Sequence, residues 1–124
     1  LAAVMSRLAR RVYTLDRFRT LVGAAQSRLL SIRVENVTPI FADGTAGWPG
    51  KAPFDRIVCT ASAEKVPAPF VEQLTTNGIL VMPIGPADGV QMLTRFDRVD
   101  RQLRASPICE VRLLPLIAGK AQTL

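Results

Sequence analysis

Short apolar segments that favour β-strands alternate with segments of helical periodicity along most of this 124-residue chain. Strands are expected at residues 11–15, 37–41, 54–60, 79–84 and 90–96, and helices at residues 1–10, 17–31 and 67–74. Parallel strands need long crossover connections, which are usually helices. The alternation therefore predicts an α/β fold, with a mainly parallel sheet and helices on both of its faces.

The last third of the chain departs from this alternation. The segment Gly85–Gly89 is a short turn, so the strands on either side of it are expected to be antiparallel. The polar residues 98–104 predict a hairpin loop, and residues 111–117 predict a last strand.

Glycine, proline and asparagine mark the breaks between the expected elements. Residues 44–53 hold three glycines and two prolines, which predicts a loop. Asn77 and Gly78 are expected to end the helix at 67–74. No apolar run approaches the ~20 residues that a membrane-spanning helix needs.

The length of the chain suits one domain. The first residue, Leu1, opens directly into a helical pattern without a leader-like segment. We therefore expect the chain to begin inside a longer domain.

Positive charge is concentrated near the start of the chain. The first 40 residues hold seven arginines and two carboxylates, a net charge of +5 out of +6 for the whole chain. A basic stripe can attract nucleic acid or acidic partners. Solvated helix faces are the favoured interpretation, because no aromatic residues are interleaved with the arginines and no nucleic-acid motif is present.

The two cysteines match no metal or redox spacing. Cys59 lies in an apolar segment and is expected to be a buried thiol, and a reducing cytoplasm fits both residues. Histidine is absent, which excludes an imidazole base or imidazole metal ligand within this chain. No glycine-rich phosphate loop, nucleophile elbow or metal cluster is present either.

Three polar residues follow successive expected strands: Asp16, Asp43 and Thr60. Ligands of open α/β sheets bind at the carboxyl ends of the strands. Asp16 is placed to accept hydrogen bonds from both hydroxyls of a ribose, or to cap the following helix, or both. Asp43 is placed to accept the amine of an adenine, with Gly44 allowing close approach, although an ordinary Asp-Gly turn is the simpler interpretation.

The amino-acid sequence resembles that of protein-L-isoaspartate O-methyltransferases over nearly the whole chain. The matching segments are 2–4, 8–9, 12–17, 42–44, 47–49, 52–58, 60–63, 66–67, 73–74, 78–85, 91–93 and 111–116. The resemblance implies a Rossmann-like S-adenosylmethionine-dependent methyltransferase fold with an antiparallel C-terminal hairpin. It implies that residues 1–124 are the C-terminal portion of one methyltransferase domain.

The resemblance also implies a cofactor role for five residues. Asp16 takes the place of the family's ribose-binding acidic residue, where Glu is commoner, and Arg17 lies beside it near the adenine edge. Asp43 and Gly44 match the family's adenine-contacting pair, and Thr60 would lie near the methyl-transfer centre. Ala42 and Ser62 are mild departures from the family pattern.

Three parts of the family pattern are not found in this sequence. They are the first, central strand, the glycine-rich loop and the segment with the catalytic serine, all of which we expect upstream of Leu1. The resemblance thus implies half of a cofactor site, no metal, and no catalytic residue within the chain. Without the central strand, a sheet edge would be exposed. We therefore expect the isolated chain to be poorly stable and prone to associate.

The implied function is protein repair in the cytoplasm. A methyl group would pass from S-adenosylmethionine to the free carboxylate of isoaspartyl residues in damaged proteins and peptides, with no nucleic acid or membrane as partner. Two alternatives stay open. One is a non-catalytic remnant that binds a nucleoside or a protein, and the other is a different methyltransferase of this fold, for example one that acts on RNA.

Overall fold

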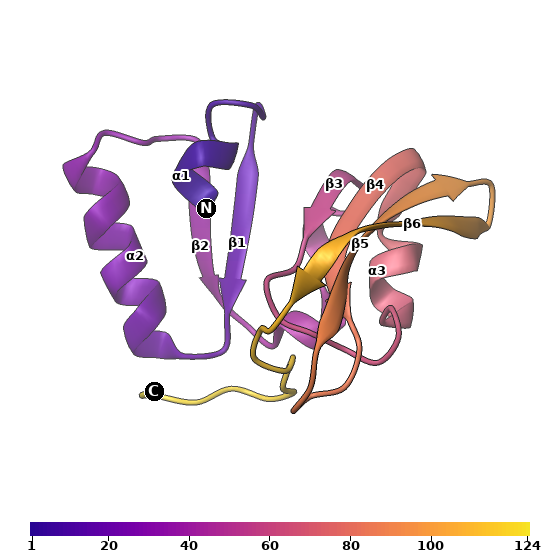
Figure 1. Cartoon of the computed structure of the whole chain (residues 1–124). Helices are drawn as coiled ribbons and strands as arrows, with labels where there is room; N and C mark the ends of the chain where they lie inside the picture. The colour runs from indigo at the N-terminus through magenta and orange to yellow at the C-terminus, as the bar shows by residue number, and fades with distance from the viewer. The chain divides into compact units, whose positions relative to one another are not determined.

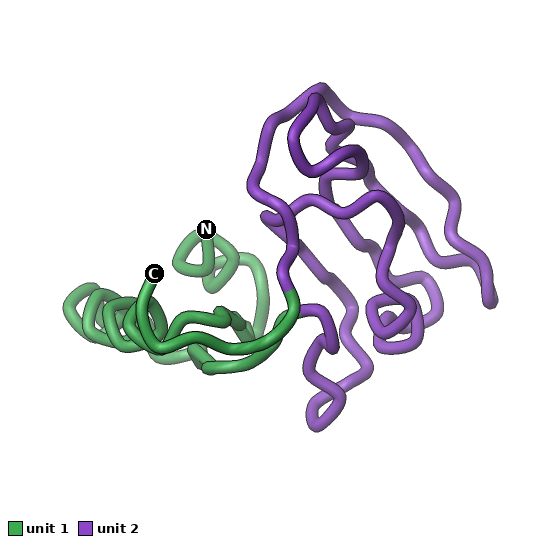
Figure 2. The backbone as a smooth tube through the Cα atoms, turned by 90° about the horizontal axis from the view of Figure 1, so that it is seen from below, with its two compact units in different colours: residues 1–44, 118–124 green, residues 45–117 purple.

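The computed structural model describes residues 1–124. The chain divides into two compact units, residues 1–44 with 118–124, and residues 45–117 (Figure 2). No helix in it is both long enough and apolar enough to cross a membrane.

The first unit is a parallel strand pair with its crossover helix (Figure 1). Its elements are α1 (Ala2–Met5), β1 (Val12–Asp16), α2 (Arg19–Ser31) and β2 (Val37–Phe41). The β1–β2 register runs from Val12 opposite Val37 to Asp16 opposite Phe41. The strands therefore end at the same edge. Four small or branched apolar residues are buried in this unit: Val12, Val22, Val37 and Ala42.

The second unit is a four-stranded mixed sheet with one short helix. Two 3-10 turns, Gly44–Ala46 and Pro49–Lys51, precede β3 (Phe54–Val58), α3 (Ala68–Glu72), β4 (Leu74–Ile84), β5 (Gln91–Val99) and β6 (Gln102–Val111). The strand order is β3-β4-β5-β6, in which β3 and β4 are parallel and the other neighbours antiparallel. The core of the unit consists of Phe70, Leu74, Leu80, Met82 and Phe96.

The fold class expected from the sequence is confirmed, but the pairing is less parallel than predicted. Two pairings, β1–β2 and β3–β4, are parallel, while β4–β5 and β5–β6 are antiparallel. The antiparallel arrangement around Gly85–Gly89 was correctly predicted.

The first helix is shorter than the predicted 1–10. The side-chain amide of Asn36 donates to the carbonyls of Ser6 (2.8 Å) and Ala9 (3.0 Å). These carbonyls bind the Asn36 amide, so the chain turns after Met5. Three apolar residues of this segment, Leu1, Val4 and Leu8, are exposed, with Leu8 84% accessible.

The predicted helix stop at Asn77-Gly78 is wrong. The helix α3 already ends at Glu72, because the carbonyl of Gln73 accepts the backbone N–H of Phe54 (2.7 Å) and the chain enters β4 at Leu74. Phe54 of β3 pairs with Leu74, and Arg56 pairs with Ile79. Residues 75–78 of β4 therefore form a bulge, in which Asn77 has a φ of 70°.

The hairpin at the end of the chain also differs from its prediction. The strands β5 and β6 pair continuously up to Val99 opposite Gln102, so the turn is confined to Asp100 and Arg101 instead of 98–104. The polar residues of β6 are tolerated in a strand because β6 is an exposed edge. The predicted last strand at 111–117 forms only an isolated bridge, from Pro115 to Ser62.

The apolar segment 54–60 is typical of a buried strand, but the strand that it forms is largely exposed. β3 pairs on one side only, with β4, and its residues Asp55, Arg56 and Val58 are exposed. An apolar run does not distinguish a central strand from an edge strand, because both need apolar residues toward the core.

Candidate functional site

The carboxyl ends of β1 and β2 bring two of the predicted site residues to one edge of the first unit. Asp16 is the last residue of β1 and lies opposite Phe41, the last residue of β2. The backbone N–H of Ala42 donates to the carbonyl of Asp16 (3.1 Å), which extends the pairing by one step. Asp43 follows directly, so both carboxylates belong to the same edge.

The Asp16 carboxylate is oriented by its own backbone. Its Oδ1 accepts the N–H of Phe18 (2.9 Å), a local turn that fixes the side chain. Phe18, and not Asp16, is the N-cap residue of α2, and it makes no side-chain capping bond. The prediction that Asp16 is the N-cap residue of α2 is therefore wrong, although its carboxylate does accept the backbone N–H of the residue just before the helix.

The Asp43 carboxylate accepts a backbone hydrogen bond from the C-terminal tail, residues 118–124. Its Oδ2 lies 2.8 Å from the amide nitrogen of Gly119. Gly44, the second residue of the predicted pair, starts the 3-10 turn Gly44–Ala46. The Asp-Gly pair thus lies between the end of β2 at Phe41 and the start of a turn at Gly44.

Arg17 is anchored to the same tail. Its Nε donates to the carbonyl of Gly119 (3.1 Å), and its own carbonyl accepts the N–H of Ala121 (2.7 Å). Its guanidinium lies 4.8 Å from the centroid of the Phe18 ring. The side chain is therefore fixed beside Asp16 at the end of β1.

Sequence reasoning missed the C-terminal tail as part of this edge. The carbonyls of Ala121 and Gln122 accept the N–H groups of Arg19 (3.0 Å) and Thr20 (3.1 Å), the first two residues of α2. A helix start leaves such groups without an intrahelical partner. The tail carries no periodicity or motif, so no signal in the sequence could have placed it here.

Two cations of this edge contact one aromatic ring. The Arg19 guanidinium lies 4.4 Å and the Lys120 ammonium 5.2 Å from the centroid of Phe41. Both distances suit cation–π attraction. The ring of Phe41, the last residue of β2, is therefore contacted by positive charge from both α2 and the C-terminal tail.

Thr60 belongs to the second unit, so it is described there by itself. It is exposed and follows β3 by two residues. Nearby, Ser62 is buried, and the carbonyl of Ser62 accepts the N–H of Leu116 (2.8 Å). The loop after β3 is thus tied to the segment after β6.

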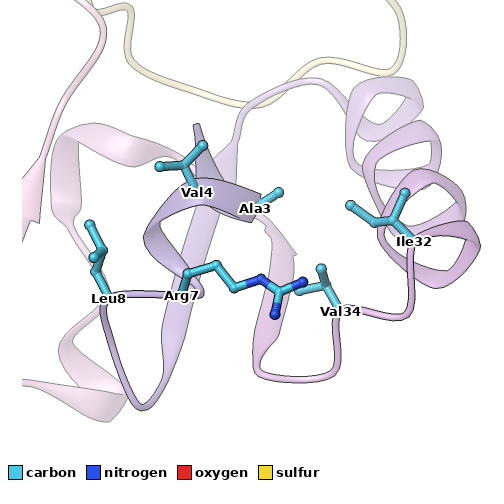
Figure 3. A pocket seen from close by; sticks show the side chains of 6 residues that line it. All are labelled: Ala3, Val4, Arg7, Leu8, Ile32 and Val34. Carbon is cyan, nitrogen blue, oxygen red and sulfur yellow. The ribbon is translucent and has the colours of Figure 1, made fainter.

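An open groove lies at the opposite end of the first unit from the carboxylates. It is lined by Ala3, Val4, Arg7, Leu8, Ile32 and Val34. These residues precede β1 or β2, and Figure 3 shows the Arg7 side chain extending toward Val34. The groove offers one cation and no acceptor side chain, so it has little in common with the carboxylate edge.

The arrangement at the carboxyl ends of β1 and β2 suits binding of a polar ligand. The residues described there offer carboxylate acceptors, cations and aromatic faces. No cluster of three metal-ligating side chains is present in the chain. Hydrogen-bond donors such as hydroxyls and amines are the ligands that two carboxylates suit best.

Comparison with known proteins identifies relatives over the full chain. The sequence profile described as protein-L-isoaspartate(D-aspartate) O-methyltransferase matches residues 1–121. Proteins named protein-L-isoaspartate O-methyltransferase from Azorhizobium caulinodans and Xanthobacter autotrophicus are 47% and 44% identical over 123 residues. These residues make up 99% of this chain but 57% and 56% of the relatives, so the chain spans little more than half their length.

Two solved structures are similar to this chain in fold. A structure named protein-L-isoaspartate O-methyltransferase superimposes with a TM-score of 0.84 at 28% identity, covering 92% of this chain and 37% of that one. A second, from Plasmodium falciparum, was solved in complex with S-adenosyl-L-homocysteine. It matches with a TM-score of 0.73 at 22% identity over 86% of this chain and 52% of that one, and so supports the fold alone.

Proposed function

This chain belongs to the protein-L-isoaspartate(D-aspartate) O-methyltransferase family, and from that membership we propose that residues 1–124 are the C-terminal portion of a repair methyltransferase domain. Its reaction would methylate the free carboxylate of isoaspartyl residues in damaged proteins and peptides. The observation that carries the proposal is the pairing of the ends of β1 and β2, which brings Asp16 and Asp43 to one edge.

We propose that this edge binds the adenosine part of S-adenosylmethionine. The residues fit such a ligand, because Asp16 and Asp43 lie at one edge and carboxylate oxygens accept hydrogen bonds from hydroxyls and amines. Asp16 would accept the ribose hydroxyls, with Arg17 beside it, and Asp43 with Gly44 would contact the adenine. Thr60 is our candidate for the neighbourhood of the transferred methyl group.

The chemistry asks little of the protein beyond positioning. When bound, S-adenosylmethionine supplies a methyl group whose bond to sulfur breaks as its bond to the carboxylate oxygen forms, releasing S-adenosylhomocysteine. The acceptor carboxylate is already a nucleophile. Correct placement of donor and acceptor can therefore supply much of the acceleration. None of the residues we assign is a catalytic residue.

We place the reaction in the cytoplasm. The two cysteines are free, which suits a reducing compartment. The proposed partners are proteins and peptides that carry an isoaspartyl residue.

The test of this function is a choice between two peptides. The protein that carries this chain is incubated with labelled S-adenosylmethionine and a peptide containing one isoaspartyl residue, or its normal aspartyl twin. Methyl transfer to the isoaspartyl peptide alone is expected. Equal labelling of both peptides, or labelling of RNA in their place, would overturn the proposal.

A substitution connects this activity to the proposed site. Asp43→Asn replaces an acceptor oxygen by a donor, so the KM for S-adenosylmethionine is expected to rise about tenfold or more, the value of one charge-assisted hydrogen bond. Asp88→Asn is the matched control, because Asp88 is exposed in the turn Gly85–Gly89. A KM that is unchanged in Asp43→Asn would contradict the adenine assignment.

A second candidate function is binding without transfer. The edge itself offers carboxylate acceptors and a fixed cation, which suit binding of a ligand with hydroxyl and amine donors. Binding of S-adenosylhomocysteine with no methylation of either peptide would support this candidate over the enzyme.

A further inference from the structure

The side-chain amide of Gln91 connects two segments that lie outside the strands of the second unit. Gln91 is the first residue of β5 and is only 2% exposed. Its Nε2 donates to the carbonyl of Pro86 (2.9 Å), in the turn after β4, and to the carbonyl of Leu113 (3.2 Å), after β6. Its Oε1 accepts the backbone N–H of Leu113 (2.8 Å). One buried side chain therefore holds the turn and the segment after β6 together.

Both ends of this amide are needed for the arrangement. The carbonyls of Pro86 and Leu113 require donors, and the N–H of Leu113 requires an acceptor. An ionised Glu side chain would keep the acceptor and lose the donors. A Met side chain has a similar size and shape and offers none of these hydrogen bonds, so it separates the packing of Gln91 from its polar contacts.

Gly85 shows how closely the turn after β4 approaches Gln91. A Cβ added to Gly85 would lie 2.9 Å from the Cα of Gln91, which is closer than two such carbon atoms pack. Because this neighbour is a backbone atom, it could move aside only if the start of β5 moved with it. The backbone of Gln91 and the start of the turn are therefore fixed together.

The segment 113–116, which begins at the partner of Gln91, is bonded in turn to the loop after β3. The N–H of Ser62 donates to the carbonyl of Leu114 (2.9 Å), and the carbonyl of Ser62 accepts the N–H of Leu116 (2.8 Å). Ser62 is only 2% exposed. The position of the segment after β6 therefore sets the position of Ser62, two residues beyond Thr60 in the same loop.

The loop after β3 and the turn after β4 lie at one edge of the sheet, because these two strands are parallel. Two backbone hydrogen bonds join them directly. The N–H of Ala63 donates to the carbonyl of Pro83 (3.2 Å), and the N–H of Gly85 donates to the carbonyl of Ala63 (3.0 Å). The carboxyl ends of parallel strands are where ligands of α/β sheets bind. Thr60 therefore belongs to a loop whose position is set by hydrogen bonds on two sides.

We propose that Gln91 is a positioning residue for methyl transfer, which acts through the segment 113–116 on the loop that carries Thr60. This inference rests on the proposed function, in which Thr60 lies near the transferred methyl group. All of these residues belong to the second unit, residues 45–117. Gln91 is buried and acts through the loop, so it is not a catalytic residue. Its hydrogen bonds hold the loop where donor and acceptor are aligned, a condition on which the rate of transfer depends steeply.

The test uses the full-length protein that carries this chain, with S-adenosylmethionine and an isoaspartyl peptide as substrates. In Gln91→Met, kcat is expected to fall about tenfold or more, because a small shift of the loop misaligns the reacting atoms. The KM for each substrate should change by less than about twofold, since the lost interaction acts in the transition state. The kcat is divided by the concentration of S-adenosylhomocysteine-binding sites, measured by calorimetry, so that an unfolded fraction does not lower it.

Thr94→Val is the matched control. Thr94 is also buried on β5, at 6% exposed, and its Oγ1 donates to the carbonyl of Met92 (2.9 Å) in the same strand. Valine has the same shape as threonine, and the hydrogen bond that it removes joins no second segment. The kcat of Thr94→Val should therefore stay within about twofold of the wild-type value. An equal fall of kcat in both variants would overturn the role of Gln91, because any lost buried hydrogen bond would then have the same effect.

A second variant covers the case in which Gln91→Met does not fold. Leu113→Pro removes the N–H that the Oε1 of Gln91 accepts, at a residue that is 39% exposed and lies outside the strands. Its kcat should fall as well, with the KM for each substrate unchanged.

The outcomes separate this inference from the proposed function. An unchanged kcat in folded Gln91→Met, or in Leu113→Pro, overturns the role of Gln91 and leaves the function intact, because the wild-type protein is active in the same assay. A KM that rises as much as kcat falls would assign the effect to substrate binding and would also overturn the role. Wild-type protein that methylates neither the isoaspartyl peptide nor its aspartyl twin overturns the proposed function, and the role of Gln91 with it.

Discussion

The two cysteines lie in different surroundings. Cys59 is half-buried after β3 and its thiol donates to the carbonyl of Ala61 (3.3 Å), whereas Cys109 is exposed on β6. Burial raises the pKa of the Cys59 thiol above its ordinary value of 9.0, although the hydrogen bond partly opposes this. The thiolate is the reactive form, so burial and a raised pKa both protect Cys59.

We expect Cys109 to react with a thiol reagent at pH 8 well before Cys59 does. The Cys109→Ser chain should show only the slow phase, and Cys59→Ala only the fast phase, when the reaction is followed by absorbance. A single fast phase in the Cys109→Ser chain would contradict the burial of Cys59.

The raised pKa of Cys59 also determines how the stability of the fold changes with pH. Because the folded pKa of Cys59 lies above the unfolded value, its contribution to stability is complete below pH 9.0 and is lost as the pH rises through the folded pKa. In the Cys59→Ala chain this loss above pH 9.0 should be absent.

At the scale of elements, the C-terminal tail completes α2. The N-cap residue Phe18 offers no capping side chain, and the tail carbonyls of Ala121 and Gln122 bind the first two N–H groups of the helix instead. The tail carbonyls thus accept N–H groups that the side chain of a serine or aspartate accepts at other helix starts. The same segment binds Asp43 and Arg17, so helix start and candidate site depend on it together.

Removal of residues 118–124 is therefore expected to loosen the start of α2. The amide protons of Arg19 and Thr20 should exchange with solvent roughly fivefold faster, since each hydrogen bond contributes about 1 kcal/mol. Exchange is measured by NMR on the two chains. Gln122→Ala is the control, because it keeps the backbone carbonyl that binds Thr20. Equal exchange in the truncated and complete chains would contradict the capping role.

At the scale of the whole molecule, each unit contains a sheet with unpaired edges. The first unit has only two strands, so β1 is paired along one side, and β3 ends the sheet of the second unit. Such edges present unpaired N–H and C=O groups that can pair with another chain. The structure therefore supports the expectation, made from the sequence, that the isolated chain is prone to associate.

We expect the isolated 124-residue chain to have an apparent mass that rises with concentration in light scattering after gel filtration. Its thermal unfolding should be broad, since a two-stranded sheet is marginally stable by itself. A monodisperse monomer with a cooperative unfolding transition would contradict this expectation.

The sequence by itself determined the order of the elements as far as β5, and it indicated that Asp16 and Asp43 lie at the ends of parallel strands. The strand β2 was predicted at its observed bounds, and α2 and β1 within two residues, because hydrophobic periodicity is a local property. The positions of Asp16 and Asp43 were indicated for the same reason. Asp16 ends β1 and Asp43 follows β2 after one residue, and the two parallel strands end at one edge.

Only the tertiary structure decided which strands are edges, where α1 and α3 end, and what contacts the carboxylates. The Asn36 amide, the Gln91 amide at Leu113 and the tail carbonyls each act across 22 or more residues of sequence. Local patterns carry no information about such partners, because hydrogen bonding between distant segments depends on how the chain packs. The physical reason is general: periodicity records which face of an element is buried, and packing alone determines what lies against it.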